Sequence, residues 1–128
     1  MAEPITLDIP APCAWISSND RGKHWGAKAR LTAEWRAAAG WRGREAGLRP
    51  MQRAEVEARV VFPTARRRDP HNLMGTVKAC LDGLVSDIGM LPDDDAKHLT
   101  ITRIDLDVDR AVSPRGILRL LITDRSDS

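Results

Sequence analysis

The fold is decided by residues 54–89, which read AEVEARVVFPTARRRDPHNLMGTVKACLDGLVSDIG. Apolar and polar side chains alternate from Ala54 to Phe62, and this period of two predicts a half-buried strand. A basic loop follows. Apolar residues then recur at steps of three and four, which predicts a helix with one apolar stripe, ended by Gly89. The stripe consists of Leu73, Val77, Leu81, Leu84 and Ile88.

The segments on either side repeat these two patterns. Alternation predicts three more strands, and helical spacing predicts one more helix, which stops at Gly40 and is followed by a loop over Trp41–Pro50. These elements are the strands Ile5–Ile9, Leu99–Val108 and Gly116–Thr123 and the helix Ala27–Ala39. The predicted order β-α-β-α-β-β indicates an α+β fold with helices packed on a mostly antiparallel or mixed sheet. We expect one domain over residues 1–128, with a polar tail at 124–128.

The composition is typical of a globular protein. The chain has 128 residues, of which 42% are hydrophobic and 30% charged, and this length supports a single core. No apolar run approaches the roughly 20 residues of a membrane span, and residues 1–10 lack the basic start of a secretory signal. Cys13 and Cys80 belong to no CxxC motif, which predicts two reduced thiols in a cytoplasmic protein.

Charge is distributed unevenly, although the formal net charge is only +2. From Arg21 to Arg53 there are nine Lys or Arg residues and two Glu, whereas from Asp82 to Asp109 there are eight Asp residues and two basic ones. A basic half beside an acidic cluster suits a surface that binds a polyanion and also holds cations. A solvated surface without a ligand is the alternative.

The chemistry is predicted to lie between Arg66 and Asp95. Clustered carboxylates repel one another unless a cation or protons offset their charge, and their oxygens suit Mg²⁺ or Mn²⁺. A metal ion held in this way polarises a phosphodiester and lowers the pKa of an attacking water. Chain connectivity predicts that Asp69, just before the helix, comes close to Asp94, in the loop after it.

Basic residues in the same segment supply the complementary groups. Lys78 lies on the helix and is a candidate for stabilising negative charge in the transition state. Arg66, Arg67 and Arg68 are candidates for phosphate contacts that set the register on DNA.

Each of these features also has a plainer interpretation. An Asp69-Pro70 pair commonly starts a helix. Lys78 and Asp82, four residues apart, can form an ordinary surface ion pair. The triplet at 93–95 can be a solvated turn. The four tryptophans can all be core or loop anchors, although Trp25 and Trp41 flank basic residues and can stack on bases.

The ordered set Arg66-Arg67-Arg68-Asp69-x-x-Asn72, a helix with Lys78 and Asp82 four apart, and a later Gly and Asp-Asp resembles the RusA-type Holliday junction resolvases. The resemblance covers most of the chain, from the first strand and the loop at 19–21 to the final hairpin, but only Arg66–Asp95 is specific. It implies a homodimer that binds four-way DNA junctions and makes paired, Mg²⁺-dependent nicks. Arg21 and Lys23 are further candidates for DNA contact.

By this resemblance, the catalytic residues are Asp69, Lys78 and Asp94, and the metal ligands are Asp69 and Asp94 with Asp93 beside them. The family motif has a second Asp where this chain has His71. A neutral imidazole binds Mn²⁺ but is a poor ligand for Mg²⁺. Asp82, on the same helix, is a candidate for the missing carboxylate.

Three functions are consistent with these residues. The first is a structure-selective, metal-dependent endodeoxyribonuclease that resolves four-way junctions in DNA recombination and repair. The second is a junction-binding module whose metal site has degenerated at His71. The third is a metal-dependent phosphoesterase that acts on small or RNA substrates.

Overall fold

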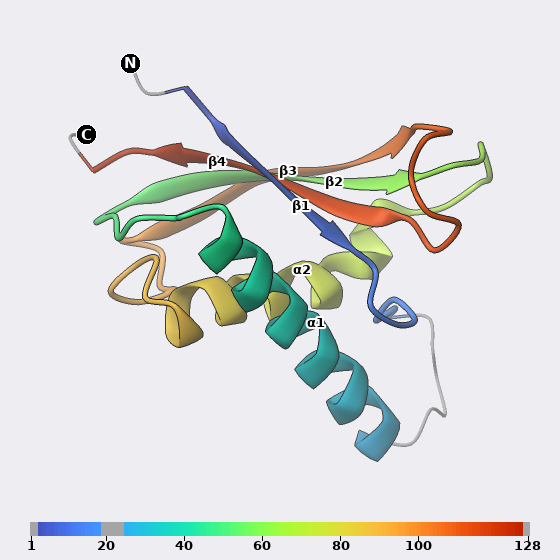
Figure 1. Ribbon diagram of the computed structural model, residues 1–128, viewed down its shortest axis with the longest axis horizontal. Coiled ribbons are helices and arrows are strands. Elements are labelled where there is room, and N and C mark those ends of the chain that lie inside the picture. Colours follow the sequence, from blue (N-terminus) through green and yellow to red (C-terminus); the bar gives the residue numbers. More distant parts are fainter. Residues whose placement is uncertain (1–2, 19–24, 127–128) are drawn as a thin grey trace.

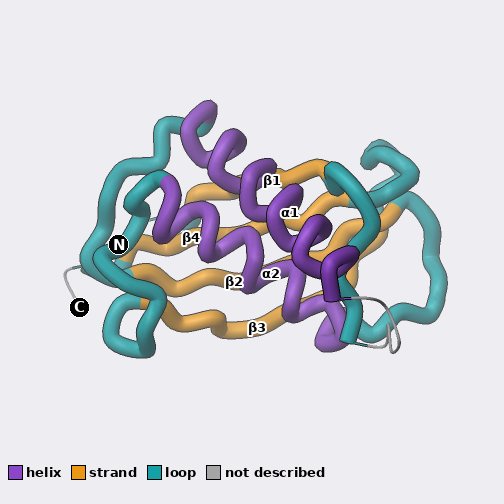
Figure 2. Tube along the Cα trace, turned by 90° about the horizontal axis from the view of Figure 1, so that it is seen from below, coloured by secondary structure: helices purple, strands orange, loops and turns teal. Residues whose placement is uncertain are grey.

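A computed structural model describes residues 3–18 and 25–126 and shows a four-stranded sheet with its helices on one face (Figures 1 and 2). Along the chain lie β1 (Ile5–Pro10), α1 (Trp25–Glu45), β2 (Ala54–Phe62), the 3₁₀ turn η1 (Pro70–Leu73), α2 (Met74–Asp82), the π-helical turn η2 (Gly83–Asp87), β3 (Leu99–Val108) and β4 (Ile117–Asp124). This is the predicted β-α-β-α-β-β order.

The sheet is mixed, as the sequence predicts. Its strand order is β1-β4-β2-β3. The pairs β1–β4 and β4–β2 are antiparallel, and β2–β3 is parallel. Parallel neighbours need a crossover connection, and α2 supplies it by running back across the sheet between β2 and β3. The start of β3 therefore lies at the opposite end of the sheet from the end of β2.

The core lies between the sheet and the two helices. Val56, Ala58 and Val60 on β2 are fully buried, whereas the residues between them are half-buried, which confirms the alternating pattern. The predicted stripe on the second helix is buried at Leu73, Val77, Leu81 and Leu84. The apolar side chains of β2 and of the second helix are therefore buried in the same layer. The polar side chains lie on the outer faces of the sheet and of the helix.

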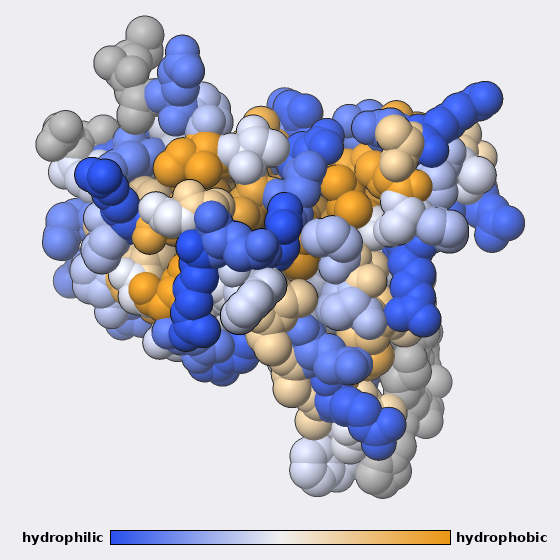
Figure 3. All heavy atoms as spheres, in the orientation of Figure 1, coloured by the Kyte–Doolittle hydropathy of each residue, from blue (hydrophilic) through white to orange (hydrophobic). Residues whose placement is uncertain are grey.

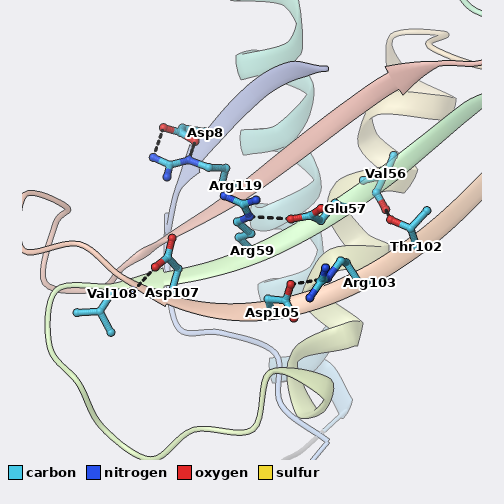
Figure 4. A network of polar contacts seen from close by, with 10 residues as sticks. All are labelled: Asp8, Val56, Glu57, Arg59, Thr102, Arg103, Asp105, Asp107, Val108 and Arg119. Atoms are coloured by element: carbon cyan, nitrogen blue, oxygen red, sulfur yellow. Dashed lines mark hydrogen bonds and ion pairs between the residues drawn. The ribbon is translucent and has the colours of Figure 1, made fainter. Parts of the chain in front are cut away.

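The sheet face away from the helices is covered by charged side chains (Figure 4). These side chains form ion pairs within one strand or across two strands, at N–O distances of 2.6–2.8 Å. They are Asp8–Arg119, Glu57–Arg59 and Arg103–Asp105. Exposed ion pairs of this kind contribute about 0–1 kcal/mol each, so they keep this face polar more than they stabilise the fold.

Helix α1 is longer than the sequence predicts, because Gly40 does not end it. The helix continues to Glu45, and Gly47 follows it with φ of +68°. A Cβ atom on Gly43 would lie 2.6 Å from the Ile88 side chain, and one on Gly83 would lie 2.3 Å from the carbonyl oxygen of Arg36. These glycines therefore allow α1 to pack closely against the end of the second helix.

The second helix is also divided more finely than predicted. The expected single helix up to Ile88 is a 3₁₀ turn, an α-helix and a π-helical turn in succession, and Gly89 ends it with φ of +72° as predicted. The N-terminal half of α1 projects from the body, and its first buried residue is Trp35 (Figures 1 and 3). Within the described residues, no helix has the length and apolar character needed to cross a bilayer.

Candidate functional site

Lys78, Asp82 and Asp94 line one pocket of about 270 Å³, whose remaining lining is Leu81, Leu99 and Ile101. We call this the carboxylate pocket. Three of the sequence-predicted site residues therefore come together, from α2 and from the loop before β3. Leu81 is buried and Leu99 and Ile101 are half-buried, so one side of the pocket is aliphatic, while Lys78 and Asp94 are exposed.

Local structure explains how these residues meet. Lys78 and Asp82 are one helical turn apart, on a side of α2 that the apolar stripe does not use. The loop carrying Asp94 is fixed against the start of β2: Met51 N donates to Met90 O at 2.7 Å, and Ala54 N donates to His98 O at 2.8 Å. The ion pair between Lys78 and Asp82, the plainer interpretation of their spacing, is not formed. Lys78 makes no salt bridge with any residue in the described ranges.

Neighbouring carboxylates raise the pKa of Asp94 in this pocket. A hydrogen bond with the Asp93 side chain raises the pKa of Asp94, and desolvation and the negative charges of Asp93 and Asp82 act in the same direction. The Asp94 backbone N–H also donates to Asp93 Oδ1 at 2.7 Å. The pocket therefore concentrates negative charge, and either a proton or a cation would relieve the repulsion.

Asp95, the third member of the triplet, has a different role. Its carboxylate contacts His98 Nδ1, and this hydrogen bond lowers the pKa of Asp95. Its carbonyl oxygen accepts from the backbone N–H groups of His98 and Leu99. Asp95 thus organises the entry into β3, while Asp94 lines the pocket.

The structure separates Asp69 from Asp94. Asp69 is the N-cap of η1, where its Oδ1 accepts from the His71 backbone N–H at 3.0 Å. Asp82 is the last residue of α2 and follows Asp69 by thirteen residues, so about 20 Å of helix lies between Asp69 and Asp82. Ligands of one Mg²⁺ ion lie only about 2 Å from it. Asp69 and Asp94 are separated because β2 and β3 are parallel. The helix that connects these strands carries the loop with Asp94 to the far end of the sheet.

The pocket's ligand chemistry fits Mg²⁺, which commonly binds through one or two carboxylates and keeps several water molecules. Among residues 3–18 and 25–126, no group of three or more His, Cys, Asp or Glu side chains is arranged to hold a metal ion. The raised pKa of Asp94 does not require the carboxylates to be close enough to share a metal ion. Two negative charges repel each other over distances longer than those between the ligands of one ion.

Of the other predicted residues, His71 lies on η1 and Arg66, Arg67 and Arg68 lie in the loop before it. His71 is exposed on η1 and does not line the carboxylate pocket. Arg66 and Arg67 are exposed, and Arg68 is half-buried. Arg21 and Lys23 fall outside the described residues. Of the two tryptophans considered for base stacking, Trp25 is 77% and Trp41 65% exposed.

Sequence reasoning missed a second concave region, a recess of about 290 Å³ close to Arg67 and Arg68. We call it the aromatic recess. Its lining comes from three distant parts of the chain: Trp15, Ser17, Phe62, Arg67, Arg68, Asp69, Asn72 and Leu73. No local pattern links Trp15 to Phe62, so only their long-range contact reveals it.

No protein-family model matches this chain, and no curated protein is significantly similar to it in sequence.

Proposed function

We propose that this protein is a divalent-metal-dependent endodeoxyribonuclease that resolves four-way DNA junctions by paired phosphodiester hydrolysis, in recombination and repair. The observation that carries the proposal is the meeting of Lys78 with Asp82 and Asp94 in one pocket. Phosphodiester hydrolysis requires negative charge on the reacting phosphate to be offset, which a lysine beside a carboxylate-bound cation can do. The RusA-type resemblance of Arg66–Asp95 implies the same activity, but it assigns the metal ion to Asp69 as well, which this proposal does not.

In this proposal, Asp82 and Asp94 hold Mg²⁺ or Mn²⁺, and Asp93 maintains the charge beside them. The bound ion would polarise a phosphate oxygen and make a water more acidic. Lys78 directs its ammonium group toward the scissile phosphate. We assign Asp69 to the N-cap of η1 instead of to this ion, because of the length of helix between it and Asp82.

The substrate implies an assembly and a compartment. Cutting two opposed strands of a two-fold junction requires two sites, and a C2 homodimer supplies them. The cytoplasm is the expected location of such an enzyme. Cys13 and Cys80 are both free thiols, which suits a reducing compartment.

A nicking assay on a four-way junction, with Mg²⁺ or Mn²⁺, tests the proposal. The wild type should cut the junction in preference to linear duplex. Asp82→Asn should abolish cutting while junction binding survives. Asp105→Asn is the matched control, because it makes the same chemical change on the opposite sheet face, where Asp105 pairs with Arg103. Binding without cutting in either metal would favour the junction-binding module.

A further inference from the structure

The aromatic recess has a rigid aromatic wall. The Trp15 ring lies 4.7 Å from the Trp35 ring and 5.2 Å from the Phe62 ring, measured between centroids. The Trp15 indole N–H donates to the carbonyl oxygen of Arg115 at 2.7 Å. Trp35 is fully buried, whereas Trp15 is only half-buried. The core therefore fixes the orientation of Trp15 and leaves part of its surface accessible.

A cationic group is held at the same recess. The guanidinium carbon of Arg68 lies 3.9 Å from the centre of the Phe62 ring, and Arg68 Nη1 donates to Thr64 O at 2.9 Å. A guanidinium fixed on one face by an aromatic ring retains a second planar face. Both arginine and tryptophan planes stack well on nucleobases.

The polar lining provides hydrogen-bonding groups. Ser18 and Asn72 tie the loop after β1 to η1: Ser18 N donates to Asn72 O at 2.9 Å, and Ser18 Oγ donates to Asn72 Oδ1 at 3.1 Å. The Asn72 side-chain amide nitrogen makes no hydrogen bond to a residue in the described ranges, so it is available as a donor.

The charges at this recess favour a base inside it and a phosphate at its rim. Asp69 lines the recess and would repel a phosphate placed within it. Arg67 is exposed and forms no ion pair within the described part of the chain. Its side chain can therefore reach a phosphate next to the bound base.

We infer that the aromatic recess binds one unstacked nucleobase of DNA, which stacks against Trp15 and Arg68 while Arg67 contacts the adjacent phosphate. Its volume of about 290 Å³ is at the small end of ligand pockets, which suits one base better than two. The inference adds to the proposed function a reader of unpaired bases, such as those at the centre of an open junction. It rests on the proposed function only in taking DNA as the ligand.

The test compares two short single strands with equal numbers of phosphates, oligo(dT) and a fully abasic strand. Binding is measured by fluorescence anisotropy in EDTA, so that no cleavage occurs. The wild type should bind oligo(dT) about 10-fold more tightly, since one stacked base contributes on that scale. Trp15→Leu should remove this preference. Arg67→Ala should weaken binding of both strands, and Arg103→Ala, the matched charge control on the open sheet face, should weaken neither.

A second measurement does not depend on the folding of a Trp15 variant. An oligonucleotide carrying 5-iodouracil is irradiated with the wild-type protein, and the crosslinked peptide is identified by mass spectrometry. A crosslink in the peptide containing Trp15 supports the inference. Equal affinity for the two strands, or a crosslink confined to peptides outside the recess, would overturn it. Base-dependent binding without junction cleavage would retain the recess while contradicting the nuclease proposal.

Discussion

The two ends of the second helical segment carry concave regions of opposite character. The carboxylate pocket, at the C-terminal end of α2, combines the half-buried Asp82 and the exposed Asp94 with Lys78. The aromatic recess, beside η1, combines fixed rings with arginines. Leu73, which lines the recess, and Lys78, which lines the pocket, are five residues apart, or about 8 Å of helix. The separation suggests a division of labour along one rigid element, with charge-dependent chemistry at one end and recognition of nucleic acid at the other.

The largest effect is expected on the rate of junction cleavage, and it distinguishes the two ends of the second helical segment. Asp94→Asn should reduce junction cleavage by at least about 100-fold, the scale seen when a group that stabilises the transition state is removed. Asp69→Asn should reduce it by less than about 3-fold, because Asn caps a helix about as well as Asp. Single-turnover nicking rates with Mg²⁺ measure both. Equal losses would contradict the assignment of the ion to the carboxylate pocket of one chain.

Much of this architecture is predictable from the sequence because it is periodic. The alternation over Ala54–Phe62 and the stripe from Leu73 to Leu84 depend on neighbours a few residues away, and both pointed to the observed buried faces. The i, i+4 spacing of Lys78 and Asp82 likewise placed them on one side of α2. Element order and mixed sheet followed from these local patterns.

What the sequence did not reveal depends on long-range packing. Gly40 looks like a helix stop, but it lies inside α1, whose close approach to the neighbouring helical segment depends on Gly43, three residues later. The proximity of Asp69 and Asp94 was inferred from connectivity, without knowing that β2 and β3 are parallel neighbours. Trp15 and Phe62 are 47 residues apart, and only the folded chain shows their contact.

The next largest effect is expected on the free energy of unfolding, through the packing of α1 against the end of the helical segment that carries the carboxylate pocket. Gly83→Ala should lower the free energy of unfolding by about 1–3 kcal/mol, the usual cost of overpacking, because the added Cβ would lie 2.3 Å from a backbone carbonyl oxygen of α1. Gly75→Ala is the control near the other end, where a Cβ would lie 3.3 Å from the Ile16 side chain and 3.9 Å from the Ile16 carbonyl oxygen. Urea unfolding measures both. A similar cost at the two positions would show that close α1 packing is not specific to the carboxylate end.

A smaller effect is expected from metal binding to the folded protein. A divalent ion favours ionised carboxylates, so it should stabilise the protein where Asp94 is deprotonated. Because its neighbours raise the pKa of Asp94, ionisation of this group disfavours the native state as pH rises, and a cation offsets that loss. Mn²⁺ at about ten times its dissociation constant should raise the melting temperature by roughly 4 °C at neutral pH.

The same thermal shift should decrease as pH falls through the titration of Asp94, since protons then displace the ion. Differential scanning fluorimetry at neutral and acidic pH measures this trend. Asp94→Asn should abolish the Mn²⁺ shift, whereas Arg67→Ala, at the opposite end of the helix, should leave it intact. A shift that persists in Asp94→Asn would place the ion elsewhere.

The smallest effect is expected on the salt dependence of DNA binding. It distinguishes residues that contact phosphates from residues that take part in the metal-dependent reaction. Each phosphate neutralised by a basic side chain adds a term of about 0.7–0.9 to the slope of log affinity against log salt. Arg67→Ala should therefore reduce that slope for junction binding by about one, measured in EDTA, and Lys78→Ala should reduce it by a similar amount if its ammonium group reaches the scissile phosphate. Only Lys78→Ala should also slow cleavage at saturating protein, because Arg67 positions the DNA without touching the reacting phosphate. A slope unchanged in both variants would mean that neither end of the helix lies against the DNA backbone.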